Sequence, residues 1–332
     1  MEESLKNKKI VVTGGAGFIG SHLTEKLINL DAKVVVIDNL STGREENVKE
    51  FIDEIDFIEA DISKEGNWQK IFKDSHWVIH LAALADIVPS IEDPKKYFDS
   101  NVIGTLNVLQ SSEINNVQKF IYSASSSCYG MPREFPTKED SEISTLYPYA
   151  LTKYLGEELV LHWEKVYRLP AISLRFFNVY GTKSRTSGTY GAVFGVFLAQ
   201  KLNKKPFTVV GDGTQTRDFT YVSDVVEAIM SALKSKVSGE IINIGSDNTY
   251  SVNELVKLLG GEVTYIPKRP GEPDCTWADI SKAKKILKWQ PKISLEQGVE
   301  KLLSQIDYWK EAPVWDSQSI EVATKKWFEY LS

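Results

Sequence analysis

The feature that most constrains how this chain folds is a group of four glycines within seven residues. They are Gly14, Gly15, Gly17 and Gly20. Directly before them, Lys9–Thr13 holds a continuous apolar, β-branched run that is typical of a buried strand. Directly after them, from Phe18 to Leu30, apolar residues recur at helical spacing. This part of the chain therefore predicts a buried strand, a tight glycine-rich turn and a helix.

Short β-branched runs alternate with longer helical patterns over the first half of the chain. The predicted strands are Lys9–Thr13, Lys33–Ile37, Asp56–Ala60, Trp77–Ala82, Lys119–Ala124 and Ala171–Phe177. The predicted helices are Phe18–Leu30, Asp93–Glu113 and Tyr149–Val166. Strands that alternate with helices form right-handed βαβ units. We therefore predict an α/β fold with a doubly wound parallel sheet, the Rossmann arrangement.

The alternation loosens after Asn178, and a segment rich in Gly, Ser and Thr, Gly181–Gly191, predicts a loop. The segments beyond it predict strands at Phe207–Gly211 and Glu262–Ile266 and helices at Ala192–Asn203 and Val252–Leu259. We expect residues 1–180 to form a first domain around this sheet, with chain segments around 213–248, including a strand at Glu240–Ile244, returning to it. Residues 181–332 would mainly form a smaller α/β substrate-binding lobe.

Near the C-terminus, six residues at i, i+3, i+4, i+7, i+8 and i+11 predict one apolar face of a helix. They are Ile320, Ala323, Thr324, Trp327, Phe328 and Leu331. We expect this helix to pack on the body of the protein.

Composition limits the classes of protein to which the chain can belong. Its 332 residues carry 39 Lys and Arg against 45 Asp and Glu, a net charge of −6, with 42% hydrophobic residues. This is an ordinary globular composition, and the acidic balance disfavours nucleic acid or anionic lipid as a partner. No apolar run approaches the ~20 residues of a membrane span, and residues 1–10 lack the apolar region of a signal peptide. Two cysteines, Cys128 and Cys275, fit a reducing cytoplasm and exclude a four-Cys zinc site, so we predict no metal.

The glycines match the spacing of a dinucleotide-binding turn. Both Gly15-x-Gly17-x-x-Gly20 and Gly14-x-x-Gly17-x-x-Gly20 are present. Glycine allows a pyrophosphate to approach the backbone, and the helix N-terminus stabilises it through free N–H groups and the helix dipole. Asp38 ends the next strand, where it can accept from an adenine ribose 2′-OH and would repel a 2′-phosphate. We therefore predict NAD rather than NADP, since Arg44 lies further along the loop and does not replace Asp38.

Two further strands end in residues that suit a cofactor. Asp61 and Ile62 follow the third strand, where an adenine ring would need one polar and one apolar neighbour. The fourth strand ends in Leu81, Ala82 and Ala83. These side chains let a cofactor lie against the backbone. His80, directly before them, is expected to be a hydrogen-bonded core histidine and is assigned no role.

A tyrosine, a lysine and a serine are expected at the same edge of the sheet. Tyr149 and Lys153 lie four residues apart on a predicted helix and project from one face, and Ser125 follows the fifth strand. Oxidising a secondary alcohol requires a base, and a phenol with pKa near 10 costs ~4 kcal/mol to ionise at pH 7. A lysine ammonium about 5 Å away offsets ~3 kcal/mol at an effective dielectric of about 20, and a positive nicotinamide can supply the remainder. Ser125 would hydrogen-bond the reacting oxygen.

The sequence resembles the extended short-chain dehydrogenase/reductases, in particular their nucleotide-sugar epimerase/dehydratase group, over nearly its whole length. The matching segments are Val11–Gly20, Ser125–Gly130, Tyr149–Lys153, Arg175–Gly181, Gly211–Gly213, Thr216–Phe219, Arg269–Glu272 and Ala278–Ala283. The resemblance implies an NAD-dependent enzyme that acts on a UDP-sugar. It also implies further cofactor-binding residues, namely Phe18, Ile19, Asn39, Asn101 and Phe176.

Substrate contacts are likewise implied by the resemblance. Arg217 and Arg269 would neutralise the pyrophosphate, which suits the fork geometry of guanidinium groups, and Glu272 would hold the nucleoside ribose. The other implied substrate-binding residues are Ser90, Ser125, Ser126, Tyr149, Asn178, Tyr190, Ala192, Val193, Thr208, Val209 and Thr276.

The group divides by chemistry. Its 4,6-dehydratases carry an Asp-Glu pair after the catalytic serine or threonine, and nucleotide-glucuronate decarboxylases keep the glutamate. Ser126 and Ser127 occupy those positions here, in a Ser-Ser-Ser-Cys-Tyr-Gly run similar to that of UDP-sugar 4-epimerases. The resemblance therefore implies an isomerase that oxidises a UDP-hexose at C4 and reduces it again from the opposite face.

Thr276 bears on substrate size. Epimerases restricted to UDP-glucose and UDP-galactose tend to carry a bulky tyrosine at the matching position, whereas those that accept N-acetylhexosamines carry a small residue. Threonine, with the loop Ser187–Tyr190, favours UDP-N-acetylglucosamine and UDP-N-acetylgalactosamine, with UDP-glucose and UDP-galactose as the second pair. Thr182-Lys183-Ser184 replaces the usual Pro-Arg-Gln, so contacts from that loop are not carried over.

Other functions stay open. One is another nucleotide-sugar enzyme of the group, such as a 4-ketoreductase, a dehydratase or a UDP-glucuronate 4-epimerase. A second is a non-catalytic NAD-binding regulator, against which the intact Ser125, Tyr149 and Lys153 set argues. The resemblance also implies a homodimer, through the helices near Asp93–Glu113 and Tyr149–Val166.

Overall fold

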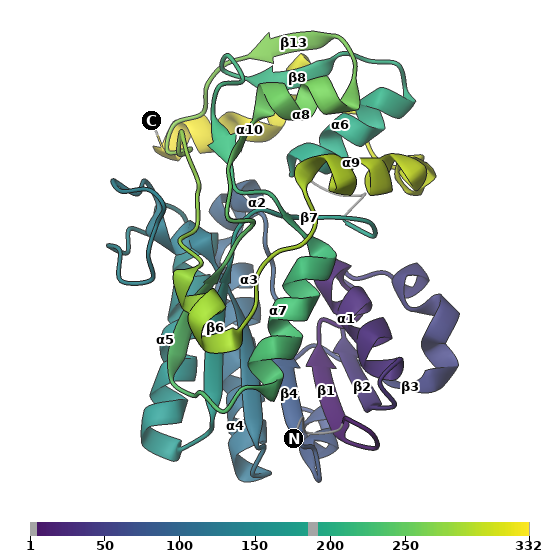
Figure 1. Ribbon diagram of the computed structural model, residues 1–332, viewed down its shortest axis with the longest axis vertical. Coiled ribbons are helices and arrows are strands. Elements are labelled where there is room, and N and C mark those ends of the chain that lie inside the picture. The colour runs from purple at the N-terminus through teal and green to yellow at the C-terminus, as the bar shows by residue number, and fades with distance from the viewer. Residues whose placement is uncertain (1–4, 185–191, 332) are drawn as a thin grey trace.

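The computed structural model describes residues 5–184 and 192–331. Within these ranges, seven parallel strands form one sheet in the order β11-β6-β5-β4-β1-β2-β3 (Figure 1). The strands are β1 (Lys9–Thr13), β2 (Lys33–Asp38), β3 (Ile55–Glu59), β4 (Trp77–His80), β5 (Lys119–Ser125), β6 (Ala171–Phe176) and β11 (Glu240–Ile244). The order reverses between β1 and β4, which is where doubly wound sheets bind ligands at their carboxyl edge. The predicted α/β fold class is confirmed.

Helices cover both faces of the sheet because successive strand residues point to opposite sides. Helices α1 (Phe18–Ile28) and α7 (Val222–Lys234) share one buried core with Ile10 and Val12 of β1. Helices α4 (Gly104–Ile114) and α5 (Pro148–Tyr167) form the core on the opposite face, with Val11. Burial on both faces therefore explains the uninterrupted apolar run of β1.

The predicted strand Trp77–Ala82 is too long at its C-terminal end. The strand stops at His80. Beyond it, Ala82 N donates to the side-chain hydroxyl of Thr13 at 3.3 Å instead of to a neighbouring strand carbonyl. The chain leaves the sheet at this point and lines the site described below.

The predicted helix Asp93–Glu113 is confirmed as one run of helical turns from Pro94 to Ile114, but it is not α-helical throughout. It consists of α3 (Pro94–Phe98), a π-helical turn (Asp99–Ile103) and α4. The side chain of Asp93 caps α3 by accepting from the backbone N–H of Lys96 at 3.1 Å. Three helices were not predicted at all, namely α2 (Ile87–Glu92), α7 and α9 (Leu295–Ser304).

A smaller set of elements lies over the carboxyl ends of the sheet (Figure 1). It contains α6 (Val193–Leu202), α8 (Val252–Leu259), α9 and the parallel pair β8 (Phe207–Val210) and β13 (Val263–Ile266). These elements share a separate buried core, in which Trp309 is fully covered. We call this set the upper lobe, and the assignment of residues 181–332 to it stays a prediction.

Short strand pairs join the upper lobe to the sheet. β7 (Val179–Tyr180) pairs with β10 (Thr220–Tyr221), and β9 (Thr216–Arg217) pairs with β12 (Tyr250–Ser251). Because β7 follows β6 and β10 precedes α7, the first pair carries the chain out of the sheet region and back.

The C-terminal helix α10 (Ser317–Leu331) packs on the body through the predicted face. Ile320, Thr324 and Trp327 are buried, and Ala323 is partly buried against the upper-lobe core. The helix also contacts α2 from the first half of the chain. It therefore bridges the upper lobe and the region beside the sheet.

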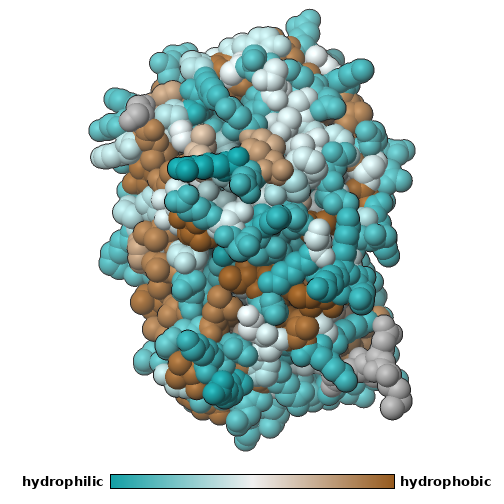
Figure 2. All heavy atoms as spheres, turned by 60° about the vertical axis from the view of Figure 1, so that its left-hand side comes forward, coloured by the Kyte–Doolittle hydropathy of each residue, from teal (hydrophilic) through white to brown (hydrophobic). Residues whose placement is uncertain are grey.

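The helices implied in a homodimer carry exposed apolar side chains at Ile103, Ile114, Val166 and Tyr167. Apolar side chains are interspersed with hydrophilic ones on the face shown in Figure 2. The homodimer stays a prediction. Among the residues that the structure describes, no helix has the length and apolar character needed to cross a membrane.

Gly298 tests how tightly the upper lobe is packed. A Cβ at this position of α9 would lie 1.9 Å from the hydroxyl of Tyr180. We expect Gly298→Ala to lower the free energy of unfolding by about 1–3 kcal/mol, the usual cost of overpacking, as measured by urea titration. Glu300→Ala on the exposed side of the same helix is the control, with a change within about 0.5 kcal/mol. Equal stability of the two variants would contradict this packing.

Candidate active site

A pocket of about 700 Å³ opens at the carboxyl ends of the strands and is lined by residues of the sheet region and the upper lobe. It brings together nearly all of the predicted site residues. Those that line it are Gly14, Gly17, Phe18, Ile19, Gly20, Asp38, Asn39, Asp61, Ile62, Leu81, Ala82, Ala83, Ser125, Ser126, Tyr149, Lys153, Phe176, Asn178, Ala192, Val193, Thr208, Arg217, Arg269, Glu272 and Thr276. Their roles stay proposals. They lie in one cavity because the fold described above brings the carboxyl ends of the strands and the upper lobe together.

Ser90 and Asn101 do not line this pocket. Ser90 is fully buried in α2, where its hydroxyl donates to Ile87 O at 2.6 Å. Asn101 is also buried and holds the loop after β4, accepting from Leu84 N at 2.8 Å and donating to Leu84 O at 3.0 Å. Val209 lies in the upper-lobe core. The loop Ser187–Tyr190, with its predicted contact Tyr190, lies outside the described residues.

The glycine turn is shaped by close backbone packing. Gly14 has φ +73°, and a Cβ there would lie 2.7 Å from Ala82 N. A Cβ at Gly20 would lie 2.0 Å from Gly14 O, so neither position accepts a side chain. At Gly17 the nearest protein atom to such a Cβ is Gly14 O at 3.1 Å, and the residue lines the pocket at the N-terminus of α1. This open cradle fits a pyrophosphate held by backbone N–H groups.

Asp38 lies at the end of β2, beside this turn. Its carboxylate accepts from Ala16 N at 3.0 Å and from Leu40 N at 2.9 Å. Burial raises the pKa of Asp38, and these backbone hydrogen bonds oppose the rise. A carboxylate has about four acceptor positions, so Asp38 keeps capacity for ribose hydroxyls. The residues present therefore fit the adenosine end of NAD.

A cross-lobe contact encloses this end of the pocket. Tyr308, from the segment after α9, donates its hydroxyl to Asn47 Oδ1 at 2.9 Å. Asn47 in turn donates from Nδ2 to Ala16 O at 3.0 Å, within the glycine turn. Arg44 lies 5.4 Å above the Tyr308 ring, and Lys183 Nζ donates to Asn47 O at 3.1 Å. None of these contacts was predicted, since 261 residues separate Tyr308 from Asn47.

The three predicted catalytic side chains meet in the middle of the pocket. Ser125 ends β5, while Tyr149 and Lys153 lie on successive turns of α5. Burial raises the pKa of Tyr149, and its hydrogen bond with Ser125 opposes this. Burial also lowers the pKa of Lys153 to about 7, against the influence of Glu157. Burial therefore disfavours the charged form of each group, the phenolate of Tyr149 and the ammonium of Lys153.

Lys153 is buried, and specific neighbours contact it. It is only 3% exposed, and its ammonium lies 4.4 Å from the centre of the Tyr122 ring. The Tyr122 hydroxyl donates to Lys153 O at 3.1 Å. One turn further along α5, the carboxylate of Glu157 is paired with Arg175 at 2.6 Å. This buried pair fixes the carboxylate that favours the charged form of Lys153.

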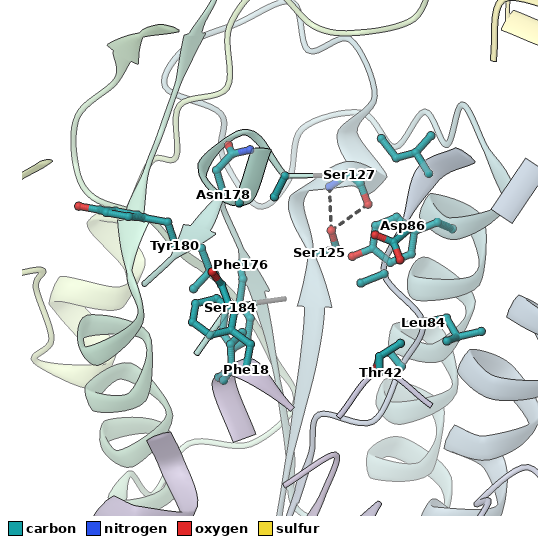
Figure 3. A pocket seen from close by; sticks show the side chains of 18 of the residues that line it. Phe18, Thr42, Leu84, Asp86, Ser125, Ser127, Phe176, Asn178, Tyr180 and Ser184 are labelled. Atoms are coloured by element: carbon teal, nitrogen blue, oxygen red, sulfur yellow. Dashed lines mark hydrogen bonds between the residues drawn. The ribbon is translucent and has the colours of Figure 1, made fainter. Parts of the chain in front are cut away.

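Two polar residues beside Ser125 were not predicted as site residues. The hydroxyl of Ser127 lies 2.8 Å from that of Ser125, and Ser127 N donates to the same oxygen at 3.2 Å (Figure 3). Asp86, from the loop after β4, lies beside this pair and its charge raises the pKa of Tyr149. Tyr147 stacks on Tyr149 with ring centres 6.4 Å apart. From the sequence, Ser127 served only to show that no acid lies at its position. Asp86 lies in the loop after a strand, which is the signal that could have identified it.

Two arginines and a glutamate face the pocket from the upper lobe. Arg217 Nη2 donates to Glu272 Oε1 at 2.9 Å, and Arg269 Nη1 lies 3.8 Å from Glu272 Oε2. The arginine side chains are 10% and 12% exposed. They therefore concentrate positive charge in a largely desolvated wall, with one carboxylate between them.

Further contacts order the rest of this wall. Thr276 donates its hydroxyl to Asn178 Oδ1 at 2.7 Å and accepts from Asp218 N at 3.2 Å. At the far side, Gln200 Nε2 donates to the Thr208 hydroxyl at 2.9 Å and to Trp315 O at 2.8 Å. Thr276 thus fixes a second predicted substrate-binding residue in addition to shaping the wall.

Comparison with known proteins identifies the family of this chain. Residues 10–245 match the model of the NAD dependent epimerase/dehydratase family. The chain belongs to this family. The cofactor of the family is NAD, which agrees with the fit of the glycine turn and Asp38.

Similar proteins extend over nearly the whole chain. A putative UDP-glucose 4-epimerase from Methanocaldococcus jannaschii is 39% identical over 89% of this chain and 97% of its own length. The structure of a UDP-N-acetylglucosamine 4-epimerase from Methanobrevibacter ruminantium, in complex with UDP-N-acetylmuramic acid, is 34% identical and has a TM-score of 0.84, covering 90% and 99%. That of a UDP-glucuronic acid 4-epimerase from Bacillus cereus with UDP-glucuronic acid and NAD is 36% identical, with a TM-score of 0.83, covering 91% and 99%. The matched relatives also include UDP-sugar decarboxylases.

His80 tests the electrostatics beneath the site. It is buried between the hydroxyls of Thr13 and Thr105, at 2.6 and 2.9 Å. Burial, and secondarily the charge of Lys153, lowers its pKa to about 3. Below pH 6.5 this histidine is protonated in the unfolded chain but stays neutral in the folded chain. The free energy of unfolding therefore falls by about 1.4 kcal/mol per pH unit as the pH decreases toward 3.

We expect His80→Gln, which keeps a donor and an acceptor for the two threonines, to flatten this dependence. The measurement is the free energy of unfolding by urea at pH 6.5, 5.5 and 4.5. His162→Gln, at an exposed histidine of α5, is the matched control and should keep the slope of the original protein. If His80→Gln also keeps that slope, the histidine does not titrate as described.

Proposed function

We propose that the protein catalyses NAD-dependent 4-epimerisation of a UDP-hexose, with UDP-N-acetylglucosamine and UDP-N-acetylgalactosamine as the favoured pair. The observation that carries this proposal is the setting of Ser125. It lies in one pocket with Tyr149 and Lys153, and the positions that would hold an acid pair for elimination are serines. These groups suffice to move one proton on and off a sugar hydroxyl.

Tyr149 acts as the base for the hydroxyl at C4. Ser125 donates a hydrogen bond to the same oxygen as it becomes a carbonyl, while Ser127 N supports the serine from behind. Bound NAD supplies the acceptor for the C4 hydrogen and, in its oxidised form, a positive ring that favours the phenolate. Since burial raises the pKa of Tyr149, the positive ring of bound NAD would favour a phenolate that the protein alone disfavours.

Epimerisation needs the 4-keto sugar to turn between the two hydrogen transfers. Arg217 and Arg269 hold the diphosphate during this rotation by bidentate hydrogen bonds, and Glu272 binds the nucleoside ribose. Thr208 and Val193 line the base end of the pocket, and Ser126 is placed for a sugar hydroxyl. The reaction causes no net redox change, so the cofactor can stay in place behind the Tyr308–Asn47 contact.

The sugar is the least constrained part of the proposal. Thr276 is small and engaged with Asn178, which leaves room in the wall for an acetamido group. The Methanobrevibacter ruminantium relative, a UDP-N-acetylglucosamine 4-epimerase, supports this choice, whereas the Bacillus cereus relative supports UDP-glucuronic acid as a substrate. Decarboxylation or dehydration would require an additional acid or base, and Asp86 is the pocket carboxylate beside Ser125 that could serve.

Product analysis tests the reaction. We expect purified protein with NAD to convert UDP-N-acetylglucosamine into UDP-N-acetylgalactosamine, as followed by NMR, with UDP-glucose and UDP-glucuronic acid tested alongside. Tyr149→Phe should lower turnover at least 1,000-fold while NAD remains bound, because only the base is lost. A 4-keto-6-deoxy sugar or a pentose as product would exclude epimerisation, and full activity of Tyr149→Phe would exclude the tyrosine as base.

Substitution of Thr276 tests the preference for an N-acetylated sugar. We expect Thr276→Tyr to lower kcat/KM for UDP-N-acetylglucosamine at least 10-fold more than for UDP-glucose, because the ring fills the wall beside the sugar. Thr276→Ser, which keeps the hydroxyl for Asn178 and Asp218 N, is the control and should preserve the ratio. An equal loss for both substrates in Thr276→Tyr would show that Thr276 acts only through Asn178.

A further inference from the structure

The C-terminal helix forms part of the wall that holds the two arginines. Trp327 is 4% exposed and lines the pocket. Its indole N–H donates to Pro270 O at 2.7 Å, and its ring lies 5.4 Å from the guanidinium carbon of Arg269. Two separate contacts from one side chain therefore reach two successive residues of the loop that carries a predicted diphosphate ligand.

The next residues of the loop are also close to the helix. A Cβ on Gly271, which has φ +67°, would lie 3.9 Å from Leu331 Cδ1. Glu272, which follows, bridges Arg217 and Arg269. Residues 269–271 of this loop are thus close to α10, and Glu272 at its end is held by the two arginines.

Other residues of α10 account for its attachment to the protein. Ile320 and Thr324 are 3% and 2% exposed on the same face, about two turns and one turn before Trp327, respectively. The helix also contacts α2. Packing of the helix alone therefore does not require the indole nitrogen, or a ring over the guanidinium, at position 327.

We infer that Trp327 is a positioning residue that holds Arg269 in the orientation required by the diphosphate. This inference rests on the proposed function, because it assumes that Arg269 binds phosphate. An arginine side chain has many rotamers, and binding is weakened when these must be restricted at the moment the ligand arrives. The aromatic face restrains the guanidinium, and the hydrogen bond to Pro270 O restrains the backbone that carries it.

The two contacts can be separated by substitution. Trp327→Phe keeps an aromatic face and removes the N–H donor, whereas Trp327→Leu removes both. We expect Trp327→Leu to weaken UDP binding to the NAD-loaded enzyme about 10-fold, as measured by calorimetry, and Trp327→Phe to weaken it about 3-fold. Uridine, which has no phosphate, should bind equally to all three proteins. In turnover, KM for the UDP-sugar should rise in parallel while kcat stays within about 2-fold.

Two controls separate positioning from general damage to the helix. Ile320→Val removes a buried methyl from the same face away from the loop, and should leave UDP binding unchanged while melting temperature reports any loss of folding. In a double-mutant cycle, Trp327→Leu should have little further effect on UDP binding in an Arg269→Ala background, because its effect passes through that arginine.

The outcomes distinguish this inference from the proposed function. If the original protein binds UDP and Trp327→Leu binds it equally well, the positioning role is wrong and the proposed function is untouched. The role is also wrong if uridine binding falls as much as UDP binding, or if the effects of Trp327→Leu and Arg269→Ala add. If the original protein does not bind UDP, the proposed function fails, and the positioning role fails with it.

Discussion

The contact between the glycine turn and the loop after β4 is the constraint on which the site depends. Gly14 approaches Ala82 so closely that a Cβ would lie 2.7 Å from its nitrogen, and Ala82 N donates to the Thr13 hydroxyl. This contact lies where the strand order reverses, between β1 and β4. It keeps the turn after β1 and the loop after β4 in direct backbone contact at the carboxyl edge of the sheet. The cofactor cradle on one side and Ser125 with its helix on the other can therefore line a single pocket.

Burial then determines how the chemical groups behave. It raises the pKa of Tyr149 and lowers that of Lys153 to about 7, so burial disfavours the charged form of each group. For Lys153 the carboxylate of Glu157 opposes this effect, and Arg175 holds that carboxylate in place by an ion pair. The same low polarity makes each correctly placed hydrogen bond stronger.

The parts that local pattern controls could be predicted from the sequence. The strands of the sheet, the glycine turn, Asp38 and the Tyr149–Lys153 pair follow from apolar periodicity and from short spacings, and the structure brings them to one edge. Ser90 and Asn101 were predicted to contact ligands but do not line the pocket, because a buried polar residue can instead satisfy groups of the protein, and here both hydrogen-bond protein atoms. The predicted helix over residues 93–113 is present, but apolar periodicity did not predict its π-helical turn, which contains the buried Asn101.

Contacts between distant segments were beyond reach of such patterns. Tyr308 meets Asn47 across 261 residues, and Trp327 meets Pro270 across 57, and neither spacing leaves a periodic trace. The apolar face of α10 predicted that the helix packs, but it could not distinguish Trp327 from its neighbours, because an indole that fills a core and one that also restrains a guanidinium have the same hydropathy. The C-terminal segment touches both ends of the pocket, through Tyr308 and Trp327. The upper lobe is thereby tied to cofactor and substrate regions alike, so a part of the chain without catalytic groups determines how firmly both are enclosed.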